Sequence, residues 1–145
     1  MAVSVVTIPL TFNKPPLSMN DRMHYMKRAR IVRQIREEVT VRLRAKRVAK
    51  PAKHVTVEFH YRPRDNRTRD PLNLAPTQKA CVDAIGPGTP ARVRGRKVAP
   101  PVPGYGLVPG DDPRYLQDTV PTIHPANRNP ACWLRLIITY PEEDQ

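Results

Sequence analysis

Acidic side chains are scarce in this sequence of 145 residues, which has 13 Asp and Glu against 25 Lys and Arg and a formal net charge of +12. An excess of this size favours a polyanionic partner, most often nucleic acid and less often an anionic membrane surface. No apolar run approaches the roughly 20 residues that span a bilayer. The first residues also lack a basic segment followed by an apolar one. We therefore expect no membrane-spanning helix and no secretion signal.

Metal-binding thiols are lacking as well, because Cys81 and Cys132 are far apart and form no Cys-x-x-Cys pair. The four histidines have no ligand spacing with them, so we do not expect a zinc site. Two buried thiols are expected rather than a disulfide.

Glycine is rare, and all six glycines fall within residues 86–110, together with six prolines and four basic residues that no acid balances. Such a stretch cannot bury enough apolar surface to fold by itself. We expect residues 86–110 to be a long, flexible basic loop inserted into the domain.

Hydrophobic periodicity predicts the remaining elements. Residues 2–12, 54–61 and 131–140 are predicted as strands, 114–124 as a weak strand, and 21–47 and about 73–85 as helices. Asn20 or Asp21 is expected to cap the first helix and Asn73 the second. His54 and His60 fall on the polar face of their strand and are expected to be solvated. The order predicts one α+β (α/β-like) domain over 1–145, with a single small mixed β-sheet, two helices and the inserted loop.

The few acids of the central region are the candidates for chemistry. Aspartates from separate elements can hold Mg²⁺, which polarises a phosphodiester and activates water. A structural alternative pairs Asp65 with an arginine and Asp83 with Lys79, and uses the Asp111-Asp112 pair in a turn. Spacing alone leaves both interpretations open.

Four segments together resemble the RusA-type Holliday-junction resolvases of bacteriophages and prophages. The segments are KPPLSMNDRMHY near the start, RTRDPLNL and QKACVDAI in the middle, and LVPGDDPRYL beyond the basic loop. The family pattern is an Arg-Asp-x-Asp-Asn-Leu loop, a helix with a lysine and x-Asp-Ala, and a later Asp-Asp pair.

The resemblance implies a structure-selective endonuclease that resolves four-way DNA junctions with Mg²⁺, or with Mn²⁺, in the cytoplasm of a bacterial host. It implies that Asp70, Asp112 and Lys79 are catalytic. The implied metal ligands are Asp70, Asp112, Asp111 and Asp83. The DNA-binding residues expected from the resemblance and the basic helix are Arg69, Arg67, Asn20, Arg22, Lys27 and Arg28.

The sequence departs from the family pattern at Leu72, where the second metal-binding aspartate is expected, and at the insertion 86–110. Because leucine cannot bind a hard cation, the alternative is a catalytically impaired homologue that only binds junctions. A basic ribosomal-protein-like module and a recruitment protein are further alternatives. A homodimer is expected, because two matched cuts need two symmetric sites, and residues 131–140 with Trp133 offer a surface for it.

Overall fold

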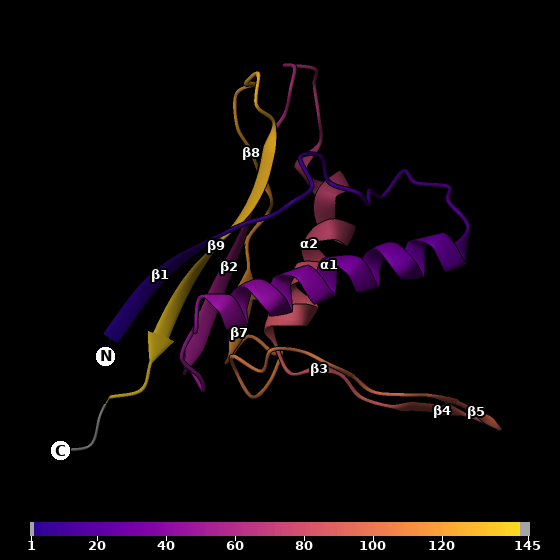
Figure 1. The fold of residues 1–145 in the computed structure, drawn as a ribbon, viewed down its shortest axis with the longest axis vertical. Helices are drawn as coiled ribbons and strands as arrows, with labels where there is room; N and C mark the ends of the chain where they lie inside the picture. The colour runs from indigo at the N-terminus through magenta and orange to yellow at the C-terminus, as the bar shows by residue number, and fades with distance from the viewer. Residues whose placement is uncertain (1, 143–145) are drawn as a thin grey trace.

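A computed structural model describes residues 2–142. Its centre is a five-stranded mixed sheet in which β9 (Ala131–Tyr140) lies between β1 (Ala2–Pro9) and β2 (His54–Arg62), antiparallel to both. On its other edge β2 pairs in parallel with β7 (Leu116–Asp118) and β8 (Thr122–Ile123). Two helices accompany this sheet (Figure 1), so the predicted α+β class is confirmed.

One hydrophobic core joins the sheet to both helices. Alternate residues of β2 and β9, such as Phe59 and Leu134, are opposite one another and fully buried. The other face of the same strands is only half-buried, because both helices pack on the core side. The strand predicted for residues 131–140 is confirmed, and it lies at the centre of the sheet between β1 and β2.

The first helix, α1 (Tyr25–Ala45), buries Ile35, Val39 and Leu43 as its period predicts. It begins four residues later than expected. Its N-cap is His24, whose Nδ1 accepts a hydrogen bond from the Met26 N–H at 3.2 Å. The predicted caps Asn20 and Asp21 are therefore wrong, because the chain before His24 folds into its own turn, closed by Asp21 Oδ2 on the Ser18 N–H.

The second helix, α2 (Ala75–Ile85), follows a short 3₁₀ helix, η1 (Pro71–Leu74). Asp70 caps η1 by accepting from the Leu72 N–H at 3.0 Å, and no side chain caps α2, so the predicted cap Asn73 is wrong. Both cysteines are buried free thiols, as expected. Burial raises the pKa of Cys132 to about 12.

Residues 86–110 differ most from their prediction. They contain β3 (Gly88–Thr89), β4 (Arg92–Arg94), β5 (Lys97–Ala99) and β6 (Val102–Pro103), which pair as β3–β6 and β4–β5. We call residues 86–104 the arm, and Figure 1 shows it extending away from the sheet. Residues 105–110 are not part of it, because Tyr105, Leu107 and Val108 are buried in the core. The predicted loop without regular structure is thus a paired ribbon on a shorter insertion.

The prediction that His60 is solvated is wrong. His60 Nδ1 lies 2.8 Å from His124 Nε2, and His60 Nε2 lies 2.9 Å from Glu58 Oε1, while Trp133 stacks on the His60 ring. His60 is therefore a partner in a packed polar cluster rather than a solvated side chain. Across residues 2–142, neither helix is both long and apolar enough to cross a membrane.

Candidate nucleic-acid interface

Asp70 lies in a basic hollow of about 350 Å³ where the end of β2 meets the start of η1. Its polar and charged lining residues come from three segments: Lys14, Ser18, Tyr61, Arg67, Thr68, Arg69, Asp70 and Asn73. Predicted site residues Asp70, Arg67 and Arg69 are therefore brought together. Three cations, Lys14, Arg67 and Arg69, line this hollow with one carboxylate, which makes it suited to an anion such as a phosphate.

Asp65 orients the two arginines of this hollow. Arg69 Nη2 lies 2.8 Å from Asp65 Oδ1, and Arg67 Nη2 lies 3.0 Å from Asp65 Oδ2. Hydrogen bonds from the Arg67 guanidinium and backbone, followed by those from Arg69, hold the pKa of Asp65 well below its usual range. The carboxylate therefore stays charged and keeps both guanidinium groups in place, as the structural interpretation of Asp65 expected.

The N-terminal loop reaches this hollow because Thr77 holds it. The Thr77 hydroxyl accepts from the Leu17 N–H at 3.0 Å and donates to the Leu17 carbonyl at 2.8 Å, and both residues are buried. Met19 adds a backbone hydrogen bond to Asn73. Sequence reasoning missed Thr77, since one threonine in a helix carries no signal of a partner 60 positions away.

A second hollow, of about 470 Å³, lies between α2 and β7. Three carboxylates line it from separate segments: Asp83 on α2, Asp111 before β7, and Asp118 at the end of β7. Lys79 also lines it, and its Nζ lies 3.3 Å from Asp83 Oδ1. Predicted site residues Lys79, Asp83 and Asp111 are therefore brought together here, and Asp118 joins them.

Gln78 fixes one wall of this acidic hollow. It is buried, and its Nε2 donates to Asp118 Oδ2 and to the Thr119 carbonyl, both at 2.7 Å. Its Oε1 is buried and has no hydrogen-bond partner in the described part of the chain. This contact ties α2 to β7. Neither Gln78 nor Asp118 stands out in the sequence, because their importance depends on the parallel pairing of β7 with β2.

Asp112 borders neither hollow as a lining residue. Its carboxylate accepts from the Arg114 N–H at 3.0 Å and from Arg114 Nε at 2.9 Å. These hydrogen bonds, led by the guanidinium one, lower the pKa of Asp112. The turn chemistry expected of the Asp111-Asp112 pair is present.

Asp70 and Asp112 lie toward opposite ends of β2. Tyr61 shares the hollow of Asp70, whereas Val55 bonds to Tyr115, and Leu116 bonds back to the Asp112 carbonyl. Tyr61 lies six residue steps beyond Val55 along the strand, which is about 20 Å at roughly 3.3 Å per step. Within one chain, these two carboxylates do not meet at one ion.

The acidic hollow has the donor chemistry that a magnesium ion uses. Mg²⁺ takes carboxylate oxygens, and it is commonly held by one or two carboxylates plus water and substrate phosphates. In residues 2–142 no three Asp, Glu, His or Cys side chains converge on a ready-made ion site. Asp83 and Asp111 are thus the groups that would hold an ion in this hollow, with the rest of its shell left to water and phosphate.

The remaining predicted DNA-binding residues lie at the start of α1 and just before it. Asn20, Arg22 and Lys27 are exposed, and Arg28 is half-buried. Lys27, Arg28, Arg30 and Arg33 make the first half of α1 strongly basic, and Arg22 adds a charge just before it. A second basic group, on the arm, comprises Arg92, Arg94, Arg96 and Lys97, all exposed.

Comparison with known proteins adds no relatives: a scan against protein-family models finds no match, and neither does a search of curated proteins.

Proposed function

We propose that this protein is a structure-selective endonuclease that binds branched DNA, such as a four-way junction, and hydrolyses phosphodiester bonds with a divalent cation. The observation that carries the proposal is the acidic hollow: Asp83, Asp111 and Asp118 gather beside Lys79 in a chain whose net charge is +12. Carboxylates weaken the attraction of a basic surface for phosphate. Their grouping in one hollow is therefore explained best by a cation that offsets them.

In this proposal one hollow binds a phosphate and the other binds the cation. Arg67, Arg69 and Lys14 offer positive charge to a phosphate beside Asp70. In the acidic hollow a bound divalent cation supplies Lewis acidity toward a phosphodiester oxygen and a more acidic water. Lys79 has an exposed ammonium group that can swing from Asp83 to a phosphate oxygen and stabilise the charge that develops there.

A second candidate function, junction binding without cleavage, is favoured by the environment of Asp70. The side chain of Leu72 is 58% exposed beside it and provides no ligand. Asp70 itself accepts the Leu72 N–H as a helix cap, and Asp112 is held by Arg114. Such carboxylates have structural tasks that need no metal.

The deciding experiment incubates the protein with an end-labelled four-way junction in Mg²⁺, Mn²⁺ or EDTA. We expect metal-dependent nicks near the crossover and none in EDTA. Junction binding without nicks in either metal would reject the endonuclease and leave the binding protein.

Asparagine variants then locate the chemistry, because Asp→Asn keeps the shape and removes the charge. Asp83→Asn and Asp111→Asn should abolish nicking if the acidic hollow holds the cation, and Asp70→Asn and Asp112→Asn if the residues implied by the family resemblance do. Junction binding should persist or tighten in each variant, because each loses a negative charge on a phosphate-binding surface. Glu142→Gln, at the far end of the chain, is the control for a general change of charge.

A further inference from the structure

The β3–β6 pair forms the base of the arm, and we call this pair the root. The root is an ordered part of the domain rather than an unstructured loop. Gly88 has φ +94°, and a Cβ on Gly88 or Gly104 would overlap backbone atoms of the facing strand or of Gly86. Only glycine allows the two strands to cross this closely. Backbone hydrogen bonds from Tyr105 to Ala84 and from Leu107 to Ile85 then join the root to the end of α2.

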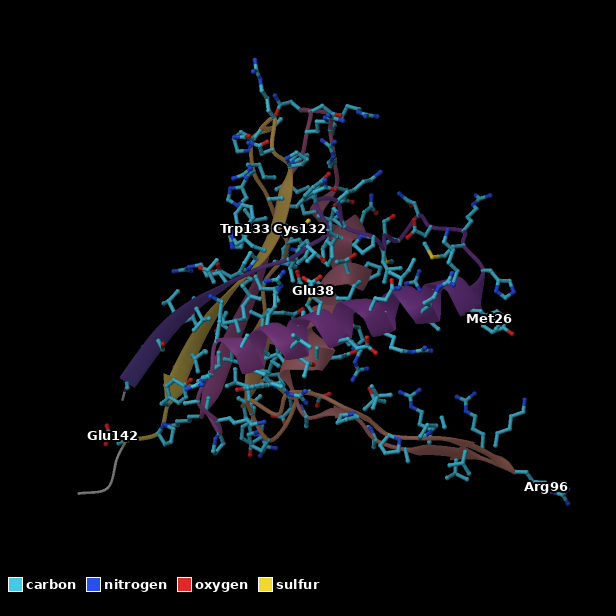
Figure 2. All side chains as sticks on the ribbon, in the orientation of Figure 1. Met26, Glu38, Arg96, Cys132, Trp133 and Glu142 are labelled. Carbon is cyan, nitrogen blue, oxygen red and sulfur yellow. The ribbon has the colours of Figure 1, made fainter. Side chains whose placement is uncertain are left out.

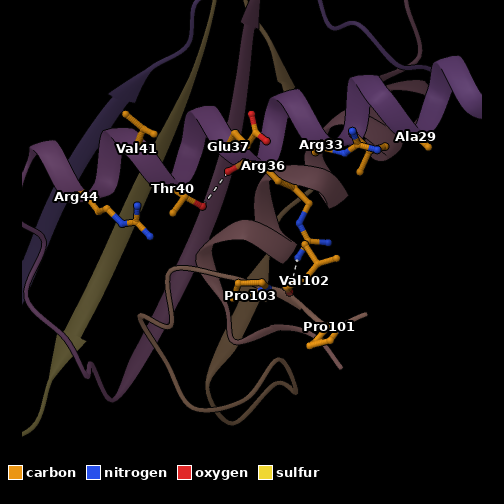
Figure 3. Close-up of a pocket in the computed structure, with 11 residues that line it drawn as sticks. Ala29, Arg33, Arg36, Glu37, Thr40, Val41, Arg44, Pro101, Val102 and Pro103 are labelled. Atoms are coloured by element: carbon orange, nitrogen blue, oxygen red, sulfur yellow. Dashed lines mark hydrogen bonds between the residues drawn. The ribbon is translucent and has the colours of Figure 1, made fainter. Parts of the chain in front are cut away.

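Arg36 ties the arm to α1. Its Nη1 donates to the Thr89 hydroxyl and its Nη2 to the Val102 carbonyl, both at 3.2 Å, so it holds both strands of the root at once. Figure 3 shows the contact with Val102. The Arg36 Nε is buried and finds no hydrogen-bond partner among residues 2–142. A planar guanidinium with two forked donors fixes direction in a way that a lysine cannot.

Between α1 and β6 lies a hollow of about 560 Å³ with basic side chains along its α1 side (Figure 3). Arg33, Arg36 and Arg44 line it from α1, and Pro101, Val102 and Pro103 line it from the arm. Glu37 is the only acid among the lining residues. The hollow therefore opens between α1, which lines it with arginines, and the base of the arm, whose own basic residues lie further out along the ribbon.

The outer part of the arm is a two-stranded ribbon with two different faces. Arg94 pairs with Lys97 and Arg92 with Ala99, whereas Val93 pairs with Val98. Since side chains alternate along a strand, the basic residues share one face and the two valines the other. In the view of Figure 2 the nitrogen-tipped side chains of the ribbon stand on the side where α1 lies, and Arg96 marks its tip.

Nothing in residues 2–142 covers the valine pair, since Val93 is 67% and Val98 65% exposed. The ribbon turns through Gly95 and Arg96, and Gly95 has φ +59°, as a tight two-residue hairpin turn requires. A narrow ribbon, basic on one face and apolar on the other, has the width and chemistry for the major groove of duplex DNA. That groove is about 12 Å wide and offers base acceptors and thymine methyl groups.

We propose that the β4–β5 ribbon enters the major groove of one duplex segment while the basic face of α1 holds the adjacent phosphates, and that Arg36 sets the angle between them. The occupant of the opening between α1 and the arm is therefore duplex DNA. This inference rests on the proposed function only for the identity of the polyanion. Cleavage is not needed for it.

The test measures DNA binding in EDTA, so that no cutting intervenes. Fluorescence anisotropy gives the affinity for a labelled duplex and a four-way junction over a series of salt concentrations. Dimethyl sulfate protection of guanine N7, which lies in the major groove, reports where the ribbon is. The wild-type protein should protect a short tract of N7 atoms on one duplex segment.

The variant Arg94→Ala/Lys97→Ala should lose that protection, whereas the slope of log affinity against log salt should change little, because the phosphate contacts that set the slope are assigned to α1. The matched control Lys46→Ala/Arg47→Ala removes the same charge just beyond the far end of α1. It should keep the protection. Arg36→Lys retains the charge but loses the forked tether, and it should shift or lose the protection as a positioning residue would.

Unchanged protection in the Arg94→Ala/Lys97→Ala protein would overturn the groove contact. Protection confined to the minor groove, or binding of single-stranded but not duplex DNA, would overturn it as well. Wild-type protection in Arg36→Lys would overturn the role of the tether. A protein that binds and protects as expected but never nicks would reject the endonuclease and leave this inference standing.

Discussion

Replacing Thr77 by valine tests whether one buried hydroxyl holds the N-terminal loop against the Asp70 hollow. Valine has nearly the shape of threonine, so packing changes little and the variant removes mainly the hydroxyl. Both Thr77 and Leu17 are buried, with exposed fractions of 0% and 1%. The Leu17 N–H and carbonyl then lose their only side-chain partner in the described hydrogen bonds.

The magnitude follows from counting the groups that stay buried. An unsatisfied buried donor or acceptor costs roughly 1–3 kcal/mol. In Thr77→Val two such groups, the Leu17 N–H and the Leu17 carbonyl, lose their partner. Part of this free-energy cost is offset, because the variant no longer buries the polar Thr77 hydroxyl. We therefore expect Thr77→Val to lower the free energy of unfolding by about 2–4 kcal/mol.

Urea unfolding measures the change, and hydrogen exchange locates it. The Leu17 amide should exchange much faster in Thr77→Val than in the wild type, whereas amides of β9 should change only with global stability. Thr77→Ser keeps the hydroxyl and should retain most of the stability and the protection of Leu17. A loss below about 0.5 kcal/mol with Leu17 still protected would refute the reasoning.

Three further predictions follow from the same structure. Leu72→Asp should leave metal-dependent nicking unchanged if the cation lies in the acidic hollow and should raise it only if a cation binds beside Asp70, in either case at little cost in stability, because position 72 is exposed. Nicking assays decide this, and Leu72→Asn is the neutral control. Acid should destabilise the protein in two stages, as urea titrations from pH 7 to about pH 2 would reveal. Burial, followed by the charges of His60 and Arg62, lowers the pKa of His124 from 6.5. The contribution of neutral His124 to the free energy of unfolding is therefore fully present above pH 6.5 and is lost as the pH falls through the folded pKa. The pKa of Glu58 is lowered from 4.5, chiefly by a hydrogen bond from His60 and against an opposing effect of burial, so the contribution of Glu58 to stability is lost below pH 4.5. His124→Gln should remove only the stage at higher pH. The protein should be a homodimer of about 33 kDa, twice the 16.5 kDa chain, by light scattering; Val5→Lys, on the open sheet face beside Ile137, should yield monomers if that face is the interface, and an active monomeric wild type would contradict the dimer.

Local periodicity was enough to predict most of the sheet and both helices. The alternation of Val55, Val57, Phe59 and Tyr61 and the four-residue spacing of Ile35, Val39 and Leu43 are each the direct mark of one buried face, and those faces are buried. The pairings of Asp65 with Arg67 and of Asp83 with Lys79 were also foreseeable, because their partners lie two to four residues away.

Tertiary structure alone decided what meets across the chain. The separation of Asp70 from Asp112 follows from their places near opposite ends of β2, and spacing along the sequence does not report which end of a strand a loop returns to. Thr77 on Leu17, Gln78 on Asp118 and Arg36 on the arm join residues 40 to 66 positions apart. The arm could not be predicted from its glycines and prolines, because these residues disfavour regular structure in general. Glycine nevertheless permits two strands to approach closely when the opposite strand supplies the hydrogen bonds. Sequence determines which faces must be buried, whereas the close approach of distant segments determines which polar groups become neighbours and therefore where chemistry can take place.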